Sequence, residues 1–535
     1  MTRGSTSREQ LLEQLGAGEQ LDWDIIVIGG GITGAGVLRE ATRRGYKTLL
    51  LEQQDFSWGT SSRSSKMVHG GLRYLASGDL KLTRESVTER ERLLNEAPGL
   101  VDRIAFYFTF RQGLFPGRWA MTCILAIYDF LAGIKDHQYC KNQQLLKQFP
   151  GLDITGVKGA SRYTDAMVDE SRLVLRVIQD SLDHGGSALN YTKVQDLVVD
   201  NGVVSGVTIK PDEDQTPITL RASAVINATG AWADPLRNQV NSEKRIRPLR
   251  GSHLIIAQTT YPVTNVMTFL HQDDKRGVYV YPWEGTTVIG TTDLDHSDDL
   301  DIEAAISNQE VDYLLNGFNR QFPNNPLSRA DIISSWAGVR PVIGSDQTNG
   351  QIKDPSKERR DHAVWFDQGL ITVSGGKLTT FRLIALDALA AAETQLPAAQ
   401  PFSDQRMFIK PNISAQTLVP DNLHWGQRLL GRYGEKAQQL LDAATAEQRN
   451  PIGTTEFSLA ECRWAIDHES VQHLDDLLLR RTRLGMCLPD GAEEIFPALE
   501  ALFKTQRGWS QAQWDDELAR YKTIWQRYYS LPQPD

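Results

Sequence analysis

A glycine-rich turn near the start of the chain restricts the fold more than any other feature. A short apolar run at 24–28 leads directly into Gly29-x-Gly31-x-x-Gly34, and good helix formers follow. The next apolar run ends in Glu52. This order of strand, tight turn, helix and strand lets helix N–H groups meet a pyrophosphate, while the acidic residue accepts ribose hydroxyls. The pattern therefore predicts a dinucleotide-binding α/β unit, without separating NAD from FAD.

Later segments alternate between helical and strand patterns. We expect helices at 83–95 and 172–184, short strands at 189–230, and antiparallel strands at 248–345 with a hairpin turn at Glu284-Gly285. A strand at 371–374 runs into a helix from 379 to about 393. Beyond residue 400 the strands fade, and capping-box patterns start helices at Ser458 and Ser510. The chain thus combines an α/β unit built from distant segments, a β-rich layer and a helical tail.

Composition excludes several classes of protein. With 57 Lys plus Arg against 67 Asp plus Glu, the net charge is −10, so no nucleic-acid partner is expected. The 4 cysteines form no CxxC pair and no His cluster accompanies them, so we predict neither disulfides nor a metal site. The first twenty residues lack the apolar stretch of a secretory signal, and no transmembrane helix is predicted. A cytoplasmic protein fits best.

Hydroxyls, glycines and cations gather in the loop at 57–74, which follows the strand ending in Glu52. Such a loop suits a phosphate-bearing ligand, although composition alone fits a surface loop equally well. Four further motifs place a cation beside a glycine or a strand end: Arg250-Gly-Ser-His253, Gly338-Val-Arg340-Pro341, Arg359-Arg360-Asp-His362 and Gly375-Gly-Lys377. Taken singly, each is typical of a surface charge or a salt bridge. Together with Arg73 they form candidates for binding a small phosphorylated substrate.

These motifs lead to a family resemblance. In order along residues 22–530, the runs GGGITGAG, GTSSRSSKMVHGGLRYL, NATGAWAD, RGSH, QDDKRGVYVYPW, VIGTTD, AGVRP, SGGKLTTFR and DHESVQHLDDLLLRRTRLGM closely resemble the aerobic FAD-dependent glycerol-3-phosphate dehydrogenases. The resemblance implies an α/β chain with a glutathione-reductase-like (Rossmann-type) FAD domain, an antiparallel β-rich substrate cap and a C-terminal α-helical domain. We expect an extension at 1–22, the FAD domain at 23–400 with the cap mainly at 75–160 and 245–345, and the helical domain at 401–535.

The resemblance also implies FAD as the cofactor and assigns its contacts. Gly29, Gly31, Gly34, Gly36 and Glu52 would hold the ADP half; Thr60, Ser61, Ser62, Ser65, Lys66, His69, Gly70, Gly71 and Leu72 would line the pyrophosphate and ring; Val194 would lie near adenine; and Gly230, Gly375, Gly376 and Leu378 would approach the flavin. No metal is implied.

The implied substrate is sn-glycerol 3-phosphate, oxidised to dihydroxyacetone phosphate. By resemblance, Arg73, Arg360 and Lys377 would bind the phosphate, while Tyr74, His253 and Arg340 would surround the C1 and C2 hydroxyls. Hydride would pass from C2 to flavin N5. His253 is the favoured base, because Arg340 stays protonated and suits a developing oxyanion.

The family further implies electron transfer to a membrane quinone, peripheral contact with the cytoplasmic face of the inner membrane, and a homodimer. Alternatives remain open: a glycerophosphate oxidase that releases hydrogen peroxide, an amine or amino-acid oxidase on the same fold, and a catalytically silent flavoprotein.

Three segments carry secondary expectations. We expect the N-terminal extension to lack fixed structure. The stretch 111–135 mixes basic and aromatic residues, which suits either a membrane interface or an ordinary buried helix. The charges at 467–483 are interpreted as ion pairs between domains.

Overall fold

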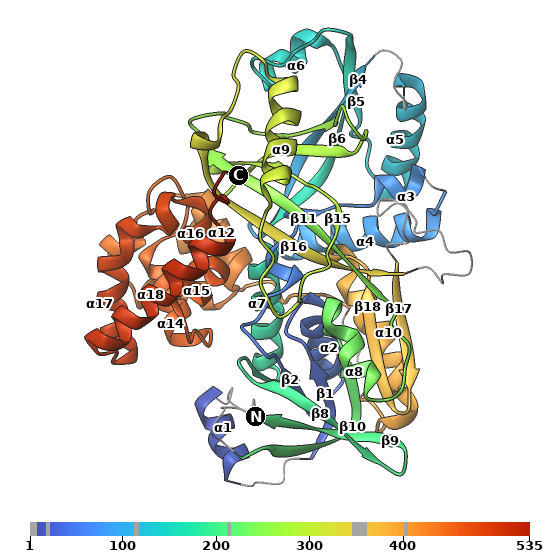
Figure 1. The fold of residues 1–535 in the computed structure, drawn as a ribbon, viewed down its shortest axis with the longest axis vertical. Helices are drawn as coiled ribbons and strands as arrows, with labels where there is room; N and C mark the ends of the chain where they lie inside the picture. The colour runs from blue at the N-terminus through green and yellow to red at the C-terminus, as the bar shows by residue number, and fades with distance from the viewer. Residues whose placement is uncertain are drawn as a thin grey trace.

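A mainly parallel sheet forms the lower part of the molecule (Figure 1). The computed structural model describes residues 8–17, 22–76, 78–111, 117–210, 216–344, 361–400 and 405–534, without the side chains of Arg73 and Ala76. Its parallel strands lie in the order β18-β10-β1-β2-β7. They are β18 (Leu370–Gly375), β10 (Ile218–Asn227), β1 (Trp23–Ile28), β2 (Thr48–Leu51) and β7 (Ser187–Leu189). Antiparallel β17 (His362–Asp367) completes one edge, and the hairpin β8 (Lys193–Asp200) and β9 (Val203–Lys210) pairs with β10.

Both faces of this sheet are covered, which explains its almost continuous apolar strands. On one face, the helices α2 (Ile32–Arg43), α7 (Glu170–Asp183) and α10 (Phe381–Ala392) pack into one core cluster with the sheet. On the other face, β8, β9 and α8 (Ala233–Asn238) bury a second cluster. The carboxyl ends of the parallel strands therefore meet at one edge, where ligands bind in open α/β sheets.

A second, mostly antiparallel sheet forms the upper part, called the cap here. Its main path is β15-β11-β14-β13-β12-β4-β6-β3, with β16 paired to β11 and β5 to β6. The strands are β3 (Met67–Val68), β4 (Val101–Arg111), β5 (Gln138–Cys140), β6 (Val157–Val168), β11 (Ile246–Ala257), β12 (Val266–Leu270), β13 (Gly277–Trp283), β14 (Thr286–Gly290), β15 (Leu294–Asp295) and β16 (Ile332–Ile343). The predicted hairpin turn is confirmed: Glu284 and Gly285 join β13 to β14 with φ values of 47° and 75°.

Helices surround the cap sheet. They are α3 (Leu72–Ala76), α4 (Leu80–Glu96), α5 (Arg118–Ala132), α6 (Asn142–Gln148) and α9 (Asn308–Gln321). Helix α5 buries Leu125 and Tyr128 but leaves Trp119 75%, Ile127 45% and Phe130 82% exposed. At 100° per residue these exposed residues fall within about 80° of one another around the helix. One face of α5 is therefore apolar and open to its surroundings.

The chain ends in a helical domain that packs beside both sheets (Figure 1). Its helices are α11 (Ala415–Leu418), α12 (Leu423–Tyr433), α13 (Lys436–Asp442), α14 (Leu459–His468), α15 (Leu474–Asp476), α16 (Leu484–Cys487), α17 (Phe496–Arg507) and α18 (Gln511–Tyr528). Ser458 and Ser510 form the predicted capping boxes, with Glu461 and Gln513 as their partners.

Buried ion pairs join this helical domain to the parallel-sheet domain, as the sequence predicted. Arg480 and Arg481 both bind Asp55, and Arg483 binds Asp169 at 3.0 Å. Burial raises the pKa of Asp169, but Arg483 and Arg432 outweigh it, and the net pKa lies below its ordinary value. The charges of this tail are therefore part of a domain interface.

The expectation of an unstructured N-terminal extension is wrong for residues 8–16. They form the helix α1 (Arg8–Gly16). Leu11 and Leu15, spaced four residues apart, are 4% and 2% exposed and pack against the β8–β9 side of the parallel sheet. The polar composition of this segment predicts no fixed structure. The two leucines stabilise the helix only because they pack against the rest of the protein.

Candidate functional site

A cavity of about 350 Å³ lies at the carboxyl ends of the parallel strands. Segments from all along the chain line it: the β1–α2 turn, the end of β2, residues 58–61, the start of β8, residues 228–232 after β10, and residues 375–378 after β18. Ten of the predicted cofactor residues line this cavity: Gly29, Gly31, Glu52, Thr60, Ser61, Val194, Gly230, Gly375, Gly376 and Leu378. The structure thus brings together residues that the sequence separates widely.

The β1–α2 turn meets the cavity as the fingerprint predicted. Gly29 has a φ of 111°, and a Cβ there would lie 2.7 Å from the Ala228 carbonyl oxygen. Gly31 is the N-cap of α2, and it lines the cavity together with Ile32 and Thr33 of the first helical turn. Gly34 and Gly36 do not line the cavity. A Cβ at Gly34 would overlap the Gly29 carbonyl, and one at Gly36 would meet Phe381 of α10.

Glu52 closes the other side of this turn. Its Oε2 accepts the Gly30 N–H at 2.6 Å and its Oε1 accepts the Gln54 N–H at 2.8 Å. Burial raises the pKa of Glu52, and the backbone N–H groups of Gln54 and Gly30 oppose that rise. The carboxylate is held rigidly at the cavity wall with lone pairs left for hydroxyl donors.

The hydroxyl-rich loop divides into two parts. Thr60 and Ser61 line the cavity, and Ser61 Oγ accepts the Ile32 N–H at 2.9 Å. The remaining predicted residues of this loop do not line the cavity: Ser62, Ser65, Lys66, His69, Gly70, Gly71 and Leu72. Gly70 donates its N–H to Asp165, and the His69 carbonyl accepts the Thr379 hydroxyl at 3.2 Å. These residues hold the loop against β6 and the segment after β18.

Lys66 is fully buried. Its Nζ donates to Glu170 and to the Ser62 carbonyl, and it lies 4.5 Å from the ring centre of Trp336. Burial lowers the pKa of Lys66 to about 8 despite the opposing charge of Glu170. Glu170 itself lines the cavity, so this ion pair forms part of the cavity floor.

The predicted base, His253, lies on β11 and is 1% exposed. Its ring stacks on Trp336 with centroids 4.5 Å apart, and its Nε2 is hydrogen-bonded to Ser65 Oγ at 2.9 Å. Among the described residues, its Nδ1 has no hydrogen-bond partner. Burial, followed by the charges of Lys66 and Arg340, holds the pKa of His253 well below 6.5. The imidazole is therefore neutral, and the same causes make it a weaker base than an exposed histidine.

Arg340 lies on β16, whereas Lys377 follows the end of β18. Arg340 on β16 donates to Asp293 at 2.7 Å and to the Thr291 hydroxyl at 3.2 Å. Lys377 lines the cavity, and its Nζ lies 3.2 Å from the ring centre of Tyr74. Arg360 and the side chain of Arg73 lie outside the described residues.

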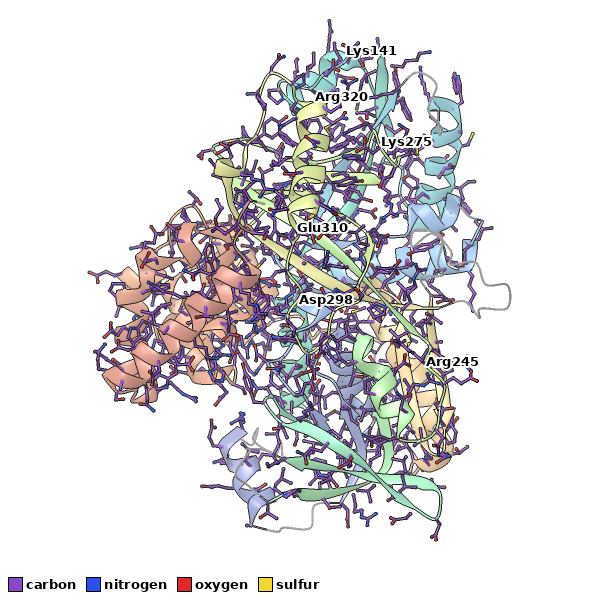
Figure 2. All side chains as sticks on the ribbon, in the orientation of Figure 1. Lys141, Arg245, Lys275, Asp298, Glu310 and Arg320 are labelled. Atoms are coloured by element: carbon purple, nitrogen blue, oxygen red, sulfur yellow. The ribbon has the colours of Figure 1, made fainter. Side chains whose placement is uncertain are left out.

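Arg250 and His362 serve structural ion pairs instead. Arg250 contacts Glu310 at 2.9 Å and Asp298 at 3.7 Å, and both carboxylates are labelled in Figure 2. His362 binds Asp387 at 2.8 Å on the outer side of α10. The contacts of Arg250 match the alternative interpretation of its motif as a salt bridge, whereas Arg359 and Arg360 of the other motif lie outside the described residues.

Sequence reasoning missed several residues of the cavity wall, above all Trp58, Trp232 and Glu170. The rings of Trp58 and Trp232 lie 5.7 Å apart. A signal for Trp232 existed, because it lies two residues after Gly230 in the short turn that follows the buried end of β10. No local pattern marks Glu170, whose role depends on Lys66 far away in the sequence.

Within the described ranges, no His, Cys, Asp and Glu side chains gather as a metal site. None of the helices in that same part of the chain is both long and apolar enough to cross a membrane.

Comparisons with known proteins agree with this geometry. A family model described as FAD dependent oxidoreductase matches residues 24–385, and one for the C-terminal domain of alpha-glycerophosphate oxidase matches residues 406–514. The aerobic glycerol-3-phosphate dehydrogenase of Staphylococcus saprophyticus subsp. saprophyticus is 30% identical over 510 residues, 90% of either chain. That of Bacillus subtilis is 35% identical over 387 residues, 71% of this chain and 68% of its own.

Solved structures extend the comparison to three dimensions. The glycerol-3-phosphate dehydrogenase from Bacillus halodurans complexed with FAD has a TM-score of 0.77 at 26% identity, covering 98% of this chain and 97% of its own. The L-alpha-glycerophosphate oxidase from Mycoplasma pneumoniae, with FAD bound, has a TM-score of 0.58 at 16% identity, covering 73% and 98% respectively. The second comparison shows a likeness of fold alone.

Proposed function

Because the chain belongs to the FAD-dependent oxidoreductases, and within them to the aerobic glycerol-3-phosphate dehydrogenase family, we propose that it oxidises sn-glycerol 3-phosphate and passes the electrons to a membrane quinone. The predicted fold class and the predicted cofactor, FAD, are both confirmed by the family match and by the similar FAD complex. The position of Lys377 carries the substrate proposal, because it places a cation in the wall of the cofactor cavity, beside Tyr74.

The cavity residues fit FAD. Glycines leave the turn after β1 open to a pyrophosphate, the N-terminus of α2 points at that position, and Glu52 suits ribose hydroxyls. Gly375 and Gly376 have φ values of 81° and 79°, so backbone rather than side chains forms the wall at that end. When bound, FAD supplies the hydride acceptor, N5.

Lys377, with Arg73 and Arg360, would bind the substrate phosphate. An ammonium group that contacts a phosphate pairs two opposite charges, whereas the Ser86 hydroxyl, which accepts from Lys377 at 3.3 Å, carries no charge. Tyr74 would keep the ammonium oriented through the contact with its ring. An amino-acid substrate would instead need cations placed for a carboxylate.

His253 and Arg340 would act on the C2 hydroxyl. As the C2 hydrogen leaves with its electron pair, the hydroxyl proton must pass to a base, and His253 would accept it on Nδ1, which has no hydrogen-bond partner among the described residues. Arg340 remains protonated and would stabilise the negative charge that develops on the oxygen. The ketone product is dihydroxyacetone phosphate.

The electron acceptor decides between a dehydrogenase and an oxidase. The same site would serve either, so the comparison of quinone reduction with peroxide release separates them. We expect quinone reduction with little peroxide; one peroxide per substrate oxidised would establish the glycerophosphate oxidase instead.

The apolar face of α5 supports contact with a membrane surface. Trp119 and Phe130 on this face would enter the interfacial region of the cytoplasmic leaflet. Serine at both positions should abolish sedimentation with anionic phospholipid vesicles, whereas Leu423→Ser, at another exposed apolar residue, should not. Equal sedimentation of both variants would exclude α5 as the contact.

An anaerobic titration tests the reaction itself. Addition of sn-glycerol 3-phosphate to the FAD-loaded protein should bleach the visible flavin band, while glycerol and an amino acid should not. A flavin that stays oxidised with the phosphate ester, or that is bleached by the amino acid, would refute the substrate assignment.

A further inference from the structure

The N-terminal helix α1 lies beside the β8–β9 hairpin of the parallel-sheet domain (Figure 1). Leu11 and Leu15 share a buried cluster with Trp23, which begins β1, and with Val194, which lines the cavity. The helix therefore shares a buried cluster with a residue of the cavity wall.

Arg8 at the start of α1 makes two hydrogen bonds to one residue. Its Nε donates to the Asn190 side-chain oxygen at 3.0 Å, and its Nη2 donates to the Asn190 carbonyl at 3.3 Å. Asn190 is completely buried, and its Nδ2 donates to Asp55 at 3.0 Å and to the Ser470 carbonyl at 2.9 Å. Loss of the Arg8 side chain would leave the Asn190 amide oxygen buried and without its charged donor.

Asn190 lies within a segment that shapes the cavity. The Glu52 N–H donates to the Leu189 carbonyl at 2.8 Å, and the Thr192 N–H returns to the Glu52 carbonyl at 2.7 Å. Glu52 and Val194 both line the cavity. Arg8 therefore holds the middle of a segment whose two sides fix the position of Glu52.

The backbone of this segment needs such support. Tyr191 has a φ of 52°, a left-handed conformation that costs a non-glycine residue free energy and persists only where surrounding contacts enforce it. Its N–H donates to the Gln54 carbonyl at 2.8 Å on one side, and Arg8 fixes the preceding residue on the other.

We propose that α1 is a strap that retains FAD: Arg8 positions Asn190 and, through the segment 189–194, keeps Glu52 and Val194 closed around the adenosine end of the cofactor. The strap also reaches the C-terminal domain, because Asp55, the acceptor for Asn190, binds Arg480 and Arg481. The inference rests on FAD being the cofactor and is independent of the substrate and of the electron acceptor.

The test measures FAD release in the absence of substrate. Arg8→Met keeps the aliphatic stem but removes both donors, and Arg8→Lys restores one. Glu9→Gln is the matched control, because Glu9 is the next residue of α1 and forms a 3.9 Å ion pair with Arg507 rather than a contact with Asn190. The rise in flavin fluorescence after dilution reports release, and the melting temperature is recorded for apoprotein and holoprotein.

We expect Arg8→Met to release FAD about tenfold faster, a ratio that corresponds to about 1.4 kcal/mol. Arg8→Lys should fall between Arg8→Met and the unchanged protein, and Glu9→Gln should match the unchanged protein. In Arg8→Met and in the truncated chain, the melting temperature should fall more for the holoprotein than for the apoprotein. Removal of residues 1–17 should give at least the effect of Arg8→Met.

Two results would overturn the proposal. Release rates of Arg8→Met and of the truncated chain within twofold of the unchanged protein would show that α1 does not retain the cofactor. An equal fall in the melting temperatures of apoprotein and holoprotein, with unchanged release, would show that α1 only stabilises the fold. Because no substrate is present, failure to oxidise glycerol 3-phosphate would leave this test intact.

Discussion

Substitution of Gly251 by alanine should slow catalysis through Arg340 without disturbing the cofactor. Gly251 lies on β11, two residues before His253. A methyl group there would lie 2.5 Å from Arg340 Nη2, 2.7 Å from Thr291 Oγ1 and 2.9 Å from the Thr292 carbonyl oxygen. The carbonyl belongs to the backbone and cannot swing away, so the guanidinium must move.

The size of the effect follows from that displacement. Ordinary contact between such atoms begins at 3.4 Å, so Arg340 Nη2 must retreat by roughly 1 Å, which would weaken its bonds to Thr291 and Asp293. A misplacement of about 1 Å in a site of this kind costs roughly 100-fold in rate. We therefore expect kcat for glycerol 3-phosphate to fall about 100-fold while FAD content and the flavin spectrum stay unchanged.

Stopped-flow reduction of the flavin under anaerobic conditions measures this step directly. Gly277→Ala on β13 is the control, because the nearest atom to its added methyl group would be Thr268 Cγ2 at 3.9 Å. If Gly251 acts through Arg340, then Gly251→Ala combined with Arg340→Ala should be no slower than Arg340→Ala alone. A reduction rate of Gly251→Ala within threefold of the unchanged enzyme would refute the reasoning.

Other predictions concern substrate binding, stability and pH. Lys377→Met should lower kcat/KM for glycerol 3-phosphate by about 10- to 150-fold, the loss of one charged hydrogen bond, with FAD retained; an unchanged ratio in steady-state assays would remove Lys377 from the phosphate site. Asp55→Ala should lower the free energy of unfolding by about 3–5 kcal/mol in urea melts, since Arg480 and Arg481 lose a buried partner, and a loss below 1 kcal/mol would contradict this. Burial, and then the charges of Lys66 and Arg340, lower the pKa of His253, so the folded residue stays unprotonated just below pH 6.5, where the unfolded residue gains a proton. A plot of kcat at saturating substrate against pH should therefore show no acid limb near pH 6.5, and such a limb would disprove a neutral His253.

The local patterns of the sequence predicted the fold well where contacts are local. The turn around Gly29, the hairpin at Glu284 and the cap of α14 at Ser458 each depend on a few neighbouring residues, and each is observed. The fingerprint and the hydroxyl-rich loop also led to part of the cavity wall: Gly29, Gly31, Glu52, Thr60 and Ser61. In each of these cases, a local backbone feature, a tight turn or a helix start, favours particular residue types at fixed positions.

Contacts between distant segments could not be predicted in this way. Lys66 sits in a loop rich in hydroxyls, which suggests a phosphate ligand, yet Glu170 of α7 draws its ammonium behind the cavity. Helix α1 has a polar composition, and two leucines decide its position only because the β8–β9 hairpin covers them. In both cases the partner, and not the residue itself, determines the environment.

The helical domain binds residues that lie next to the cavity lining, although none of its own described residues lines the cavity. Arg483 binds Asp169 at the start of α7 and donates to the Ser62 carbonyl at 3.2 Å. The next residue, Glu170, lines the cavity and pairs with Lys66. Buried ion pairs add little net stability compared with apolar contacts, but breaking one leaves an uncompensated charge. Displacement of the helical domain would therefore leave the buried Asp169 carboxylate without Arg483, next to Glu170 of the cavity wall. Cofactor binding and docking of the helical domain thus favour the same arrangement.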